Sequence, residues 1–491
     1  MSFFYDGHPR LAFFFANPNH EGSLYLMAAF VFLAGAAWLL RRRHAWQVAC
    51  GLSCGLCAAA SLLLLALTYS RGAYVAFFAL TLAGGACSLW RERRLDPHEP
   101  KWRSLRHFWL PAAFLLMLLL LPGGGKRIGT MASPREDLSI ANRLYLWRGG
   151  TVYLAHNWLR GLETHYGQPA RGYTVWLQPV EKNEAYRTFV SDVLTSAVCH
   201  GLPRYGLTLA LQLWGFLALF SLWRKRGRPE LLWLLCAPAS FLLCGVFNTC
   251  TDEAFLRICF LSLMAAVWGA VLWSTLRHKH PNLLRQGLCA FGMSALFCVA
   301  LFCAGVLSEQ LMPYRLYPLP NDSREIPSKI TLTPRKVTAC RRVLFFADAL
   351  DGYARTLLLP LASQGVPVEA IQCEGGVDSL EEVRDELTAD GPLKNAVVVA
   401  CGLNAPNTVC AALGALPQAP QNSSAIFCGL EMNHPIPELT PQLDKLPIPA
   451  FTLPAEAADT FPPSEENQLL DATTREAFAA EKWKRGGRNG Q

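Results

Sequence analysis

The chain has 491 residues, of which 52% are hydrophobic and 17% are charged, and its formal net charge is +8. A soluble domain carries about 25% charged residues, so this deficit excludes an ordinary soluble enzyme, a disordered chain and a small disulfide-rich secreted protein. The excess Lys and Arg residues fall in short clusters between long apolar runs. This pattern indicates orientation in a membrane, and it argues against a nucleic-acid partner.

Eight apolar runs are predicted to cross a membrane, because about 20 apolar residues span the hydrocarbon core. In chain order they are Leu24–Leu40, Trp46–Leu67, Ala73–Trp90, Phe108–Leu121, Leu207–Trp223, Leu231–Phe247, Phe255–Trp273 and Leu288–Leu307. We therefore expect a polytopic α-helical membrane protein with about eight spans.

The basic clusters predict how these runs are oriented, since Lys and Arg favour cytoplasmic loops. Connections after the first, third, fifth and seventh runs are basic, as in Arg41-Arg42-Arg43, whereas Asn248–Ala254 holds no Lys or Arg. The alternation places both termini, the long connection Pro122–Tyr205 and the chain after Ser308 on the outer side. In the bacterial inner membrane, the location that we expect, this side is the periplasm.

The connection Pro122–Tyr205 is a large outer loop, and loops of this length are usually functional. Within it, Ile140–Trp158 is predicted to be an amphipathic helix at the membrane interface that carries Arg143 and Arg148. A second helix is expected over Thr188–Val198. The apolar stripe of the first helix is formed by Leu144, Trp147, Thr151, Leu154 and Trp158.

Short motifs surround this loop in a fixed order. They are Phe15-Ala16-Asn17-Pro18-Asn19-His20, Thr68-Tyr69-Ser70-Arg71-Gly72-Ala73, Asn142-Arg143 followed by Trp147, Asn157-Trp158-Leu159-Arg160-Gly161 and Gly201-Leu202-Pro203. Together they resemble the O-antigen ligase and polymerase family of integral-membrane glycosyltransferases. The resemblance covers about residues 10 to 230, and the Ser-Arg-Gly-Ala turn is its most specific part.

The resemblance implies transfer of a glycan from a polyprenyl diphosphate to a hydroxyl on lipid A-core, a growing glycan or a protein. The leaving diphosphate gains charge, and Arg suits it because its planar fork makes two bonds to phosphate and stays charged. Arg71 and Arg143 are therefore the predicted diphosphate clamp. The outer loops show no carboxylate cluster with metal-ligand spacing, so no metal or other cofactor is expected. Alternatively, both arginines contact lipid headgroups.

The acceptor hydroxyl needs a base, for which His165 and His200 are the catalytic candidates. The further loop residues that remain open for this role are His156, Glu163 and Asp192. The resemblance departs from the family here, because Phe189-Val190-Ser191-Asp192 stands where a His-Asn pair is usual.

Other motif residues are predicted to bind the substrate. They are Ser70, Asn17, Asn19, Trp147 and Arg148. Capping of a helix by Asn19 or Ser23 explains the polar start of the first run equally well. In a later loop, Asp252 and Glu253 are expected to form a local ion pair with Arg257.

The composition changes after residue 307, which ends the membrane domain. Residues 308–339 are predicted to be a Pro-rich linker, residues 340–463 an α/β domain with a parallel sheet, and residues 464–491 a disordered tail. The expected strands and helices are Arg342–Ala347, Ala354–Ser363, Val366–Gln372, Leu380–Leu387, Asn395–Ala400, Thr408–Leu416, Ala425–Cys428 and Ile448–Leu453.

Two turns of this α/β domain resemble those of α/β-hydrolases. Gly402-Leu403-Asn404-Ala405-Pro406 follows a strand and precedes a helix, where the nucleophile elbow G-x-S-x-G belongs, and Asp348–Arg355 takes the place of the oxyanion loop. Asn404 cannot attack an ester as a serine does. The resemblance therefore implies a non-catalytic domain that binds a glycan or a partner. In an oxidising compartment its cysteines allow a disulfide.

Three functions follow from these patterns. The first is a metal-independent glycosyltransferase, whose partners are a polyprenyl-diphosphate-linked glycan, a lipid or glycan acceptor and membrane lipids. The second is a non-catalytic scaffold or glycan-binding subunit of an envelope polysaccharide system. The third, a transporter of lipid-linked sugars, is disfavoured because the apolar runs hold almost no charged residues to line a path.

Overall fold

The computed structural model describes residues 11, 13–42, 44–95, 106, 108–121, 138–161, 188–278, 282–317, 328–348, 350, 352–373, 377–389, 391–402, 404–418, 420–428, 445–453, 473–474 and 476–477. These residues form two compact units, a helical unit up to residue 305 and an α/β unit from residue 306 onward. Each unit has its own hydrophobic core.

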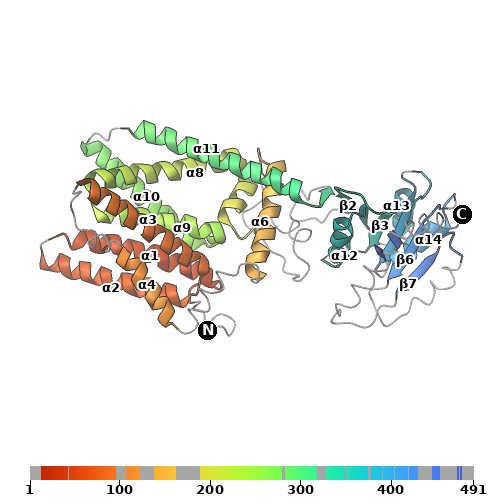
Figure 1. Ribbon diagram of the computed structural model, residues 1–491, viewed down its shortest axis with the longest axis horizontal. Helices are drawn as coiled ribbons and strands as arrows, with labels where there is room; N and C mark the ends of the chain where they lie inside the picture. Colours follow the sequence, from red (N-terminus) through yellow and green to blue (C-terminus); the bar gives the residue numbers. More distant parts are fainter. Residues whose placement is uncertain are drawn as a thin grey trace, which may run out of the picture. The chain divides into compact units, whose positions relative to one another are not determined.

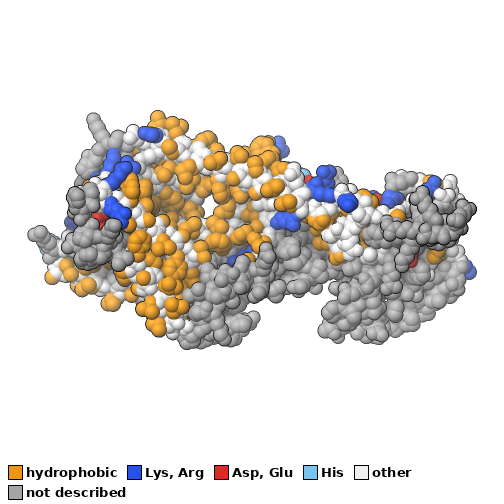
Figure 2. Space-filling view, viewed as in Figure 1, with side chains coloured by type: hydrophobic (Ala, Val, Ile, Leu, Met, Phe, Trp, Pro, Cys, Tyr) orange, Lys and Arg blue, Asp and Glu red, His pale blue; other side chains and the backbone are white. Residues whose placement is uncertain are grey.

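The helical unit is built around long apolar helices. Seven in the described part of the chain are long and apolar enough to cross a membrane: α1 (Pro18–Leu39), α2 (Ala45–Leu67), α3 (Arg71–Leu95), α8 (Asp192–Arg226), α9 (Pro229–Phe247), α10 (Ala254–His278) and α11 (Leu283–Leu311). Large apolar side chains are exposed along them, and Figure 2 shows this as a nearly continuous hydrophobic surface. Such a surface is expected in lipid and not in water, so the chain is a multi-pass membrane protein.

The fourth predicted run forms a short helix. α4 (Trp109–Leu120) has 12 residues, which at 1.5 Å per residue reach about 18 Å, against about 30 Å of hydrocarbon. It packs its Phe114 against Tyr74 and Phe77 of α3. The described residues thus give seven long helices and one short one where eight spans were expected.

Helix α8 combines two segments that the sequence analysis predicted to be separate, a loop helix and the fifth apolar run. The outer-loop helix predicted over Thr188–Val198 begins at Asp192 and continues into the fifth apolar run. Gly201 interrupts it with φ 72° and ψ 160°, a conformation that glycine adopts without a Cβ clash. The Gly-Leu-Pro motif therefore marks a kink inside one helix.

The outer-loop helix α6 (Leu138–His156) packs inside the helical unit. The face that it buries differs in part from the apolar stripe predicted from the sequence. Leu146, Val152, Tyr153 and Leu154 are at most 3% exposed, whereas Leu144 of the predicted apolar stripe is 56% exposed. Gly150 allows this packing, since a Cβ there would lie 2.5 Å from a methyl carbon of Leu194 on α8. Of the predicted stripe, Leu154 is buried and Leu144 is exposed, so the buried face of α6 matches the stripe in part, and its place at a membrane interface stays a prediction.

The helices alternate between two ends of the unit, as Figure 1 shows. At one end, the basic end, α1 stops near Arg41, which pairs with Glu230 at the start of α9 at 3.1 Å. At the other end, α1, α3 and α10 begin and α9 stops; this end carries the buried polar groups described below. Arg41, Arg91, Arg106 and Arg224 all lie at the basic end, in line with the charge alternation of the sequence.

The α/β unit contains a seven-stranded sheet of order β1-β2-β4-β3-β5-β6-β7. Strands β3 to β7 are parallel to one another, and β2 is antiparallel to both β1 and β4. The strands are β1 (Tyr314–Tyr317), β2 (Lys329–Pro334), β3 (Arg342–Ala347), β4 (Val368–Gln372), β5 (Ala396–Cys401), β6 (Ser424–Cys428) and β7 (Ala450–Leu453). Its helices are α12 (Gly352–Ser363), α13 (Val377–Thr388) and α14 (Ala405–Gly414).

The predicted linker 308–339 contributes the first two strands of this sheet. In β2, Ile330 and Leu332 are at most 1% exposed, and Thr331 and Thr333 alternate with them. This period of two is a strand signal, and the surrounding prolines obscured it. The linker interpretation was therefore wrong for β1 and β2.

Candidate functional site

Buried polar residues gather at the end of the helical unit where α1 begins. Asn17 caps α1 by accepting a hydrogen bond from the Asn19 backbone N–H at 2.9 Å, so the cap is Asn17 and not Asn19 or Ser23. Three and four residues after Asn17, His20 is 6% exposed and Glu21 is fully buried. Ionisable residues in the first turn of an apolar helix are costly to bury, which makes them functional candidates.

Glu21 holds the chain that leads into α1. Its Oε1 accepts hydrogen bonds from the backbone N–H groups of Phe13 at 2.7 Å and Phe15 at 2.9 Å, and also from Phe14. Three backbone amides thus share one carboxylate oxygen as their acceptor. This residue shapes the entrance to α1, and the sequence analysis did not single it out.

His20 connects α1 to the loop between α9 and α10. Its Nδ1 lies 3.3 Å from Oε1 of Glu253, and three residues further along α1 the Oγ of Ser23 lies 3.2 Å from the Sγ of Cys250. Glu253 therefore reaches a residue on another helix, whereas Arg257 interacts electrostatically with the neighbouring Asp252, as the predicted local pair implies. His20 stood within a quoted motif but was not chosen as a site residue.

The start of α8 meets the same loop. Asp192 accepts a hydrogen bond from the Thr251 backbone N–H at 3.1 Å and another from its hydroxyl, and the Asp192 N–H donates to the Asn248 carbonyl at 3.0 Å. We name His20, Ser70, Asp192, Asn248 and Glu253 the polar cluster. In this cluster Asp192, an alternative base in the sequence analysis, is committed to hydrogen bonds.

Small residues bring the motif helices α3 and α6 to the cluster. A Cβ on Gly22 of α1 would lie 2.8 Å from the Cβ of Ser70, and one on Gly72 of α3 would lie 3.2 Å from Phe247 and 3.3 Å from Asn248. On α6, the Trp147 ring packs on the Phe247 ring with centroids 6.1 Å apart. The helices that carry Arg71 and Arg143 thus both approach Phe247, the last residue of α9.

Several polar atoms around the cluster are buried without a hydrogen-bond partner. Of eleven such side-chain atoms in the described residues, five are here besides His20 Nδ1, which keeps its ion-pair contact with Glu253: His20 Nε2, Glu21 Oε2, Ser70 Oγ, Trp147 Nε1 and Arg148 Nη2. Native proteins leave few such atoms, and each requires an explanation. A bound polar ligand at this end of the unit would explain the group.

Two residues next to the cluster adopt left-handed backbone conformations without being glycine. Tyr69, which precedes Ser70, has φ 50°, and Val190, which precedes Ser191, has φ 51°. This conformation is unusual for a β-branched residue such as Val190, and strain of this kind is concentrated at functional sites.

The predicted site residues divide into three groups. Those whose helices or turns meet at the polar cluster are Asn17, Asn19, Ser70, Arg71, Arg143, Trp147 and Arg148. His200 is half-buried at the end of the first part of α8, just before the Gly201 kink, and His156 is exposed at the end of α6. His165 and Glu163 lie outside the described residues.

Burial also changes the acidity of groups in the loop between α9 and α10. Desolvation raises the pKa of Asp252, and the nearby His20 opposes this shift. Burial, with Asp192 nearby, raises the pKa of Cys250 well above the value of a free thiol, so Cys250 stays neutral. Within the described part of the chain, no group of three His, Cys, Asp or Glu side chains could hold a metal ion.

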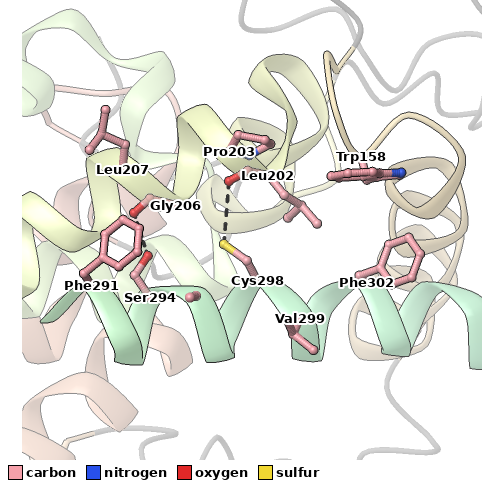
Figure 3. A pocket seen from close by; sticks show the side chains of 11 residues that line it. Trp158, Leu202, Pro203, Gly206, Leu207, Phe291, Ser294, Cys298, Val299 and Phe302 are labelled. Carbon is pink, nitrogen blue, oxygen red and sulfur yellow. Dashed lines mark hydrogen bonds between the residues drawn. The ribbon is translucent and has the colours of Figure 1, made fainter. Parts of the chain in front are cut away.

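An apolar groove of about 430 Å³ lies between the second part of α8 and α11. Figure 3 shows Trp158 from the turn after α6 at one side, Leu202, Pro203 and Leu207 from α8, and Phe291 and Phe302 from α11. Ser294 and Cys298 bond to backbone carbonyls of Gly206 and Leu202. Its polar side chains are therefore already occupied, and the groove offers an apolar surface.

In the α/β unit, the turn after β5 is held by a carboxylate from the end of β3. Asp348 Oδ1 accepts the backbone N–H of Ala405 at 2.7 Å and that of Asn404 at 3.2 Å. Asn404 has ordinary helical angles, φ −98° and ψ −40°, and Gly402 has the positive φ, 124°. The backbone of a strained nucleophile elbow is thus absent at Asn404. No disulfide joins Cys340, Cys373, Cys401 or Cys410, so the disulfide allowed by the sequence does not form among them.

No protein family model matches this chain, and neither a curated protein nor a solved structure matches it.

Proposed function

We propose that the polar cluster binds the diphosphate and sugar of a polyprenyl-diphosphate glycan, and that the chain transfers this glycan to a hydroxyl acceptor. The observation that carries the proposal is the group of buried, unpartnered polar atoms at the point where the helices of Arg71 and Arg143 approach Phe247. These helices start with the motifs that resemble the O-antigen ligase and polymerase family. An arginine fork suits a diphosphate that gains charge as it leaves.

The location of the cluster supports transfer on the outer face of a bacterial inner membrane. The polar cluster lies at the opposite end of the helices from the basic clusters, and basic ends favour the cytoplasm. This distribution of charge supports an orientation in which the cluster and both termini face the periplasm. The apolar groove between α8 and α11 is lined by side chains that suit an isoprenoid chain.

The test of this proposal is substitution of the clamp in a strain that lacks the native gene. Arg71→Ala and Arg143→Ala are each expected to reduce glycan transfer at least about tenfold, and Arg71→Lys to restore only part, because an ammonium lacks the planar fork. The readout is the lipid-linked glycan that accumulates and the mature glycan that is lost. Arg42→Ala is the matched control, because Arg42 stacks on Trp38 at the basic end. Unchanged transfer in Arg71→Ala would overturn the clamp.

A second candidate function, a non-catalytic glycan-binding subunit, is favoured by the α/β unit. Its strand order, with β2 antiparallel, is that of α/β-hydrolases, and Asn404 follows β5 at the position of their nucleophile. In such enzymes the amide after the nucleophile binds the oxyanion, but here Asp348 occupies the Ala405 amide. Both features support a domain that binds and does not hydrolyse. If a chain without the α/β unit transferred glycan normally, the unit would not be needed for transfer, and binding would be its remaining role.

A further inference from the structure

A second cavity lies at the basic end of the helical unit, where α3 and α8 end and α4 and α9 begin. Its volume is about 570 Å³, and its polar side chains include Ser88, Arg91, Glu92 and Arg106. The lining of this cavity shares no residue with the polar cluster.

Arg91 is placed in this cavity by the turn after α8. Its Nε donates to the Arg224 carbonyl at 3.4 Å, and its guanidinium lies against Gly227, where a Cβ would collide with it. Gly227 also has a left-handed φ of 65°, so two independent constraints favour glycine at this position. The turn at Gly227 thus fixes the position of the Arg91 guanidinium.

The charge of the cavity is positive. Arg91, Arg106 and Glu92 line the cavity and sum to one positive charge, with Glu92 in contact with Arg106. Arg224, Lys225, Arg226 and Arg228 follow directly on the adjoining turn. Figure 2 shows Lys and Arg side chains gathered at this end of the helical unit.

The opposite wall of the cavity is apolar. Leu110 and Leu232 are each 6% exposed and Trp223 is 3% exposed, and Trp109 and Trp233 complete this wall. Gly84 and Gly85 line it without side chains, and a Cβ on Gly84 would still lie 3.6 Å from its nearest neighbour, Leu232. Tryptophan is enriched where membrane proteins meet lipid headgroups. The cavity therefore combines a cationic rim with an aromatic and aliphatic wall.

We propose that this cavity binds one anionic phospholipid from the leaflet at the basic end. Arg91 and Arg106 contact the phosphodiester, and the glycerol and upper acyl chain lie against Trp109, Leu110 and Trp233. Basic pockets between membrane helices on the cytoplasmic side bind anionic headgroups in this way, and the guanidinium fork suits phosphate. A neutral headgroup lacks the net negative charge that the rim complements.

The test is a lipid titration of the purified full chain followed by native mass spectrometry. Phosphatidylglycerol is expected to bind with a stoichiometry of one, and phosphatidylcholine about tenfold more weakly. Arg91→Ala and Arg106→Ala are each expected to weaken phosphatidylglycerol binding about tenfold, the effect of losing a hydrogen bond to a charged group. Ser88→Phe, which fills the cavity, should block the site while leaving every arginine in place.

Arg94→Ala is the matched control, because Arg94 stacks on Trp90 with its Cζ 4.3 Å from the ring centroid and does not line the cavity. It should bind phosphatidylglycerol like the unsubstituted chain. Equal binding of the two lipids, equal losses in Arg94→Ala and Arg91→Ala, or full competition by inorganic phosphate would each overturn the proposal. Arg91→Lys, which keeps the charge, covers the case in which Arg91→Ala fails to fold.

Discussion

His20 on α1 and Glu253 at the start of α10 are 233 positions apart in the sequence, yet their side chains meet at 3.3 Å. The contact ties the first long helix to the loop between α9 and α10, whose Thr251 also donates a hydrogen bond to Asp192. Any chemistry at the polar cluster takes place next to this pair. His20 and Glu253 therefore join Arg71 and Arg143 as first targets for mutagenesis.

The pH dependence of stability should report on Asp252. Burial raises the pKa of Asp252 above that of a free carboxyl, so the folded chain binds its proton more tightly than the unfolded chain. The contribution of Asp252 to the free energy of unfolding is fully present below about pH 4. It is lost as the pH rises through the pKa that Asp252 has in the folded chain. Asp252→Asn should therefore raise the melting temperature at pH 7 and change it little at pH 4.

Thermal unfolding in detergent at several pH values measures this difference. Ser53→Ala is the control, because Ser53 is exposed on α2 and its hydroxyl does not titrate in this range. A difference between Asp252→Asn and the unsubstituted chain that stays constant from pH 4 to pH 7 would contradict the assigned shift.

Glu21 should be a structural requirement of the entrance to α1. Glu21→Ala leaves the amides of Phe13, Phe14 and Phe15 without their acceptor, and one buried orphaned group costs about 1–3 kcal/mol. Glu21→Gln keeps an acceptor oxygen and should lose less. The free energy of unfolding in detergent measures the loss in each variant. Asn17→Ala serves as the reference, because the loss of a helix N-cap costs about 0.5–2 kcal/mol. If Glu21→Gln and Glu21→Ala lost the same amount, hydrogen-bond acceptance would not be the role of Glu21.

The sequence predicted the spanning helices well because each is a long apolar run, and such runs have few alternative structures. It also predicted β3 with the same bounds, Arg342–Ala347, since five buried residues in a row indicate a strand within a sheet. It failed at β1 and β2, where prolines at 313, 318, 320 and 327 gave the impression of a linker. Composition averaged over a segment hid a short alternating pattern.

The candidate site was predicted in part. The sequence singled out Ser70, Arg71 and Trp147 because they stand in motifs, and their roles stay predictions. The contacts that gather the polar cluster come from helix packing, which no local pattern records. One signal was present: His20 and Glu21 lie at the start of an apolar helix, where ionisable residues are rare. The predicted first span began at Leu24, so it left both of them outside. Placing the span boundary at Pro18, where α1 begins, would have drawn attention to them.

The close approach of α9 to α8 should depend on Gly245. A Cβ at this position would lie 2.6 Å from Oδ2 and 3.1 Å from Cβ of Asp192, so Gly245→Ala must displace Asp192 from Thr251. We expect a loss of about 1–3 kcal/mol in the free energy of unfolding, as for other overpacked sites. Gly269→Ala on α10 is the matched control, since a Cβ there meets nothing within 4 Å. Equal stabilities of these two variants would show that α8 and α9 can separate without cost.

Asp348 should govern the start of α14 in the α/β unit. Its carboxylate accepts the N–H groups of Asn404 and Ala405, so Asp348→Ala removes a helix cap worth about 0.5–2 kcal/mol. This loss corresponds to about tenfold faster local opening. Hydrogen–deuterium exchange of the peptide that contains Asn404–Thr408 measures it in the full-length chain. Asp385→Ala, an exposed position on α13, should leave the exchange of this peptide unchanged. Slow exchange in Asp348→Ala would mean that contacts other than the Asp348 carboxylate hold this turn. In that variant the Ala405 amide, which no longer bonds to the carboxylate, would be open to a ligand.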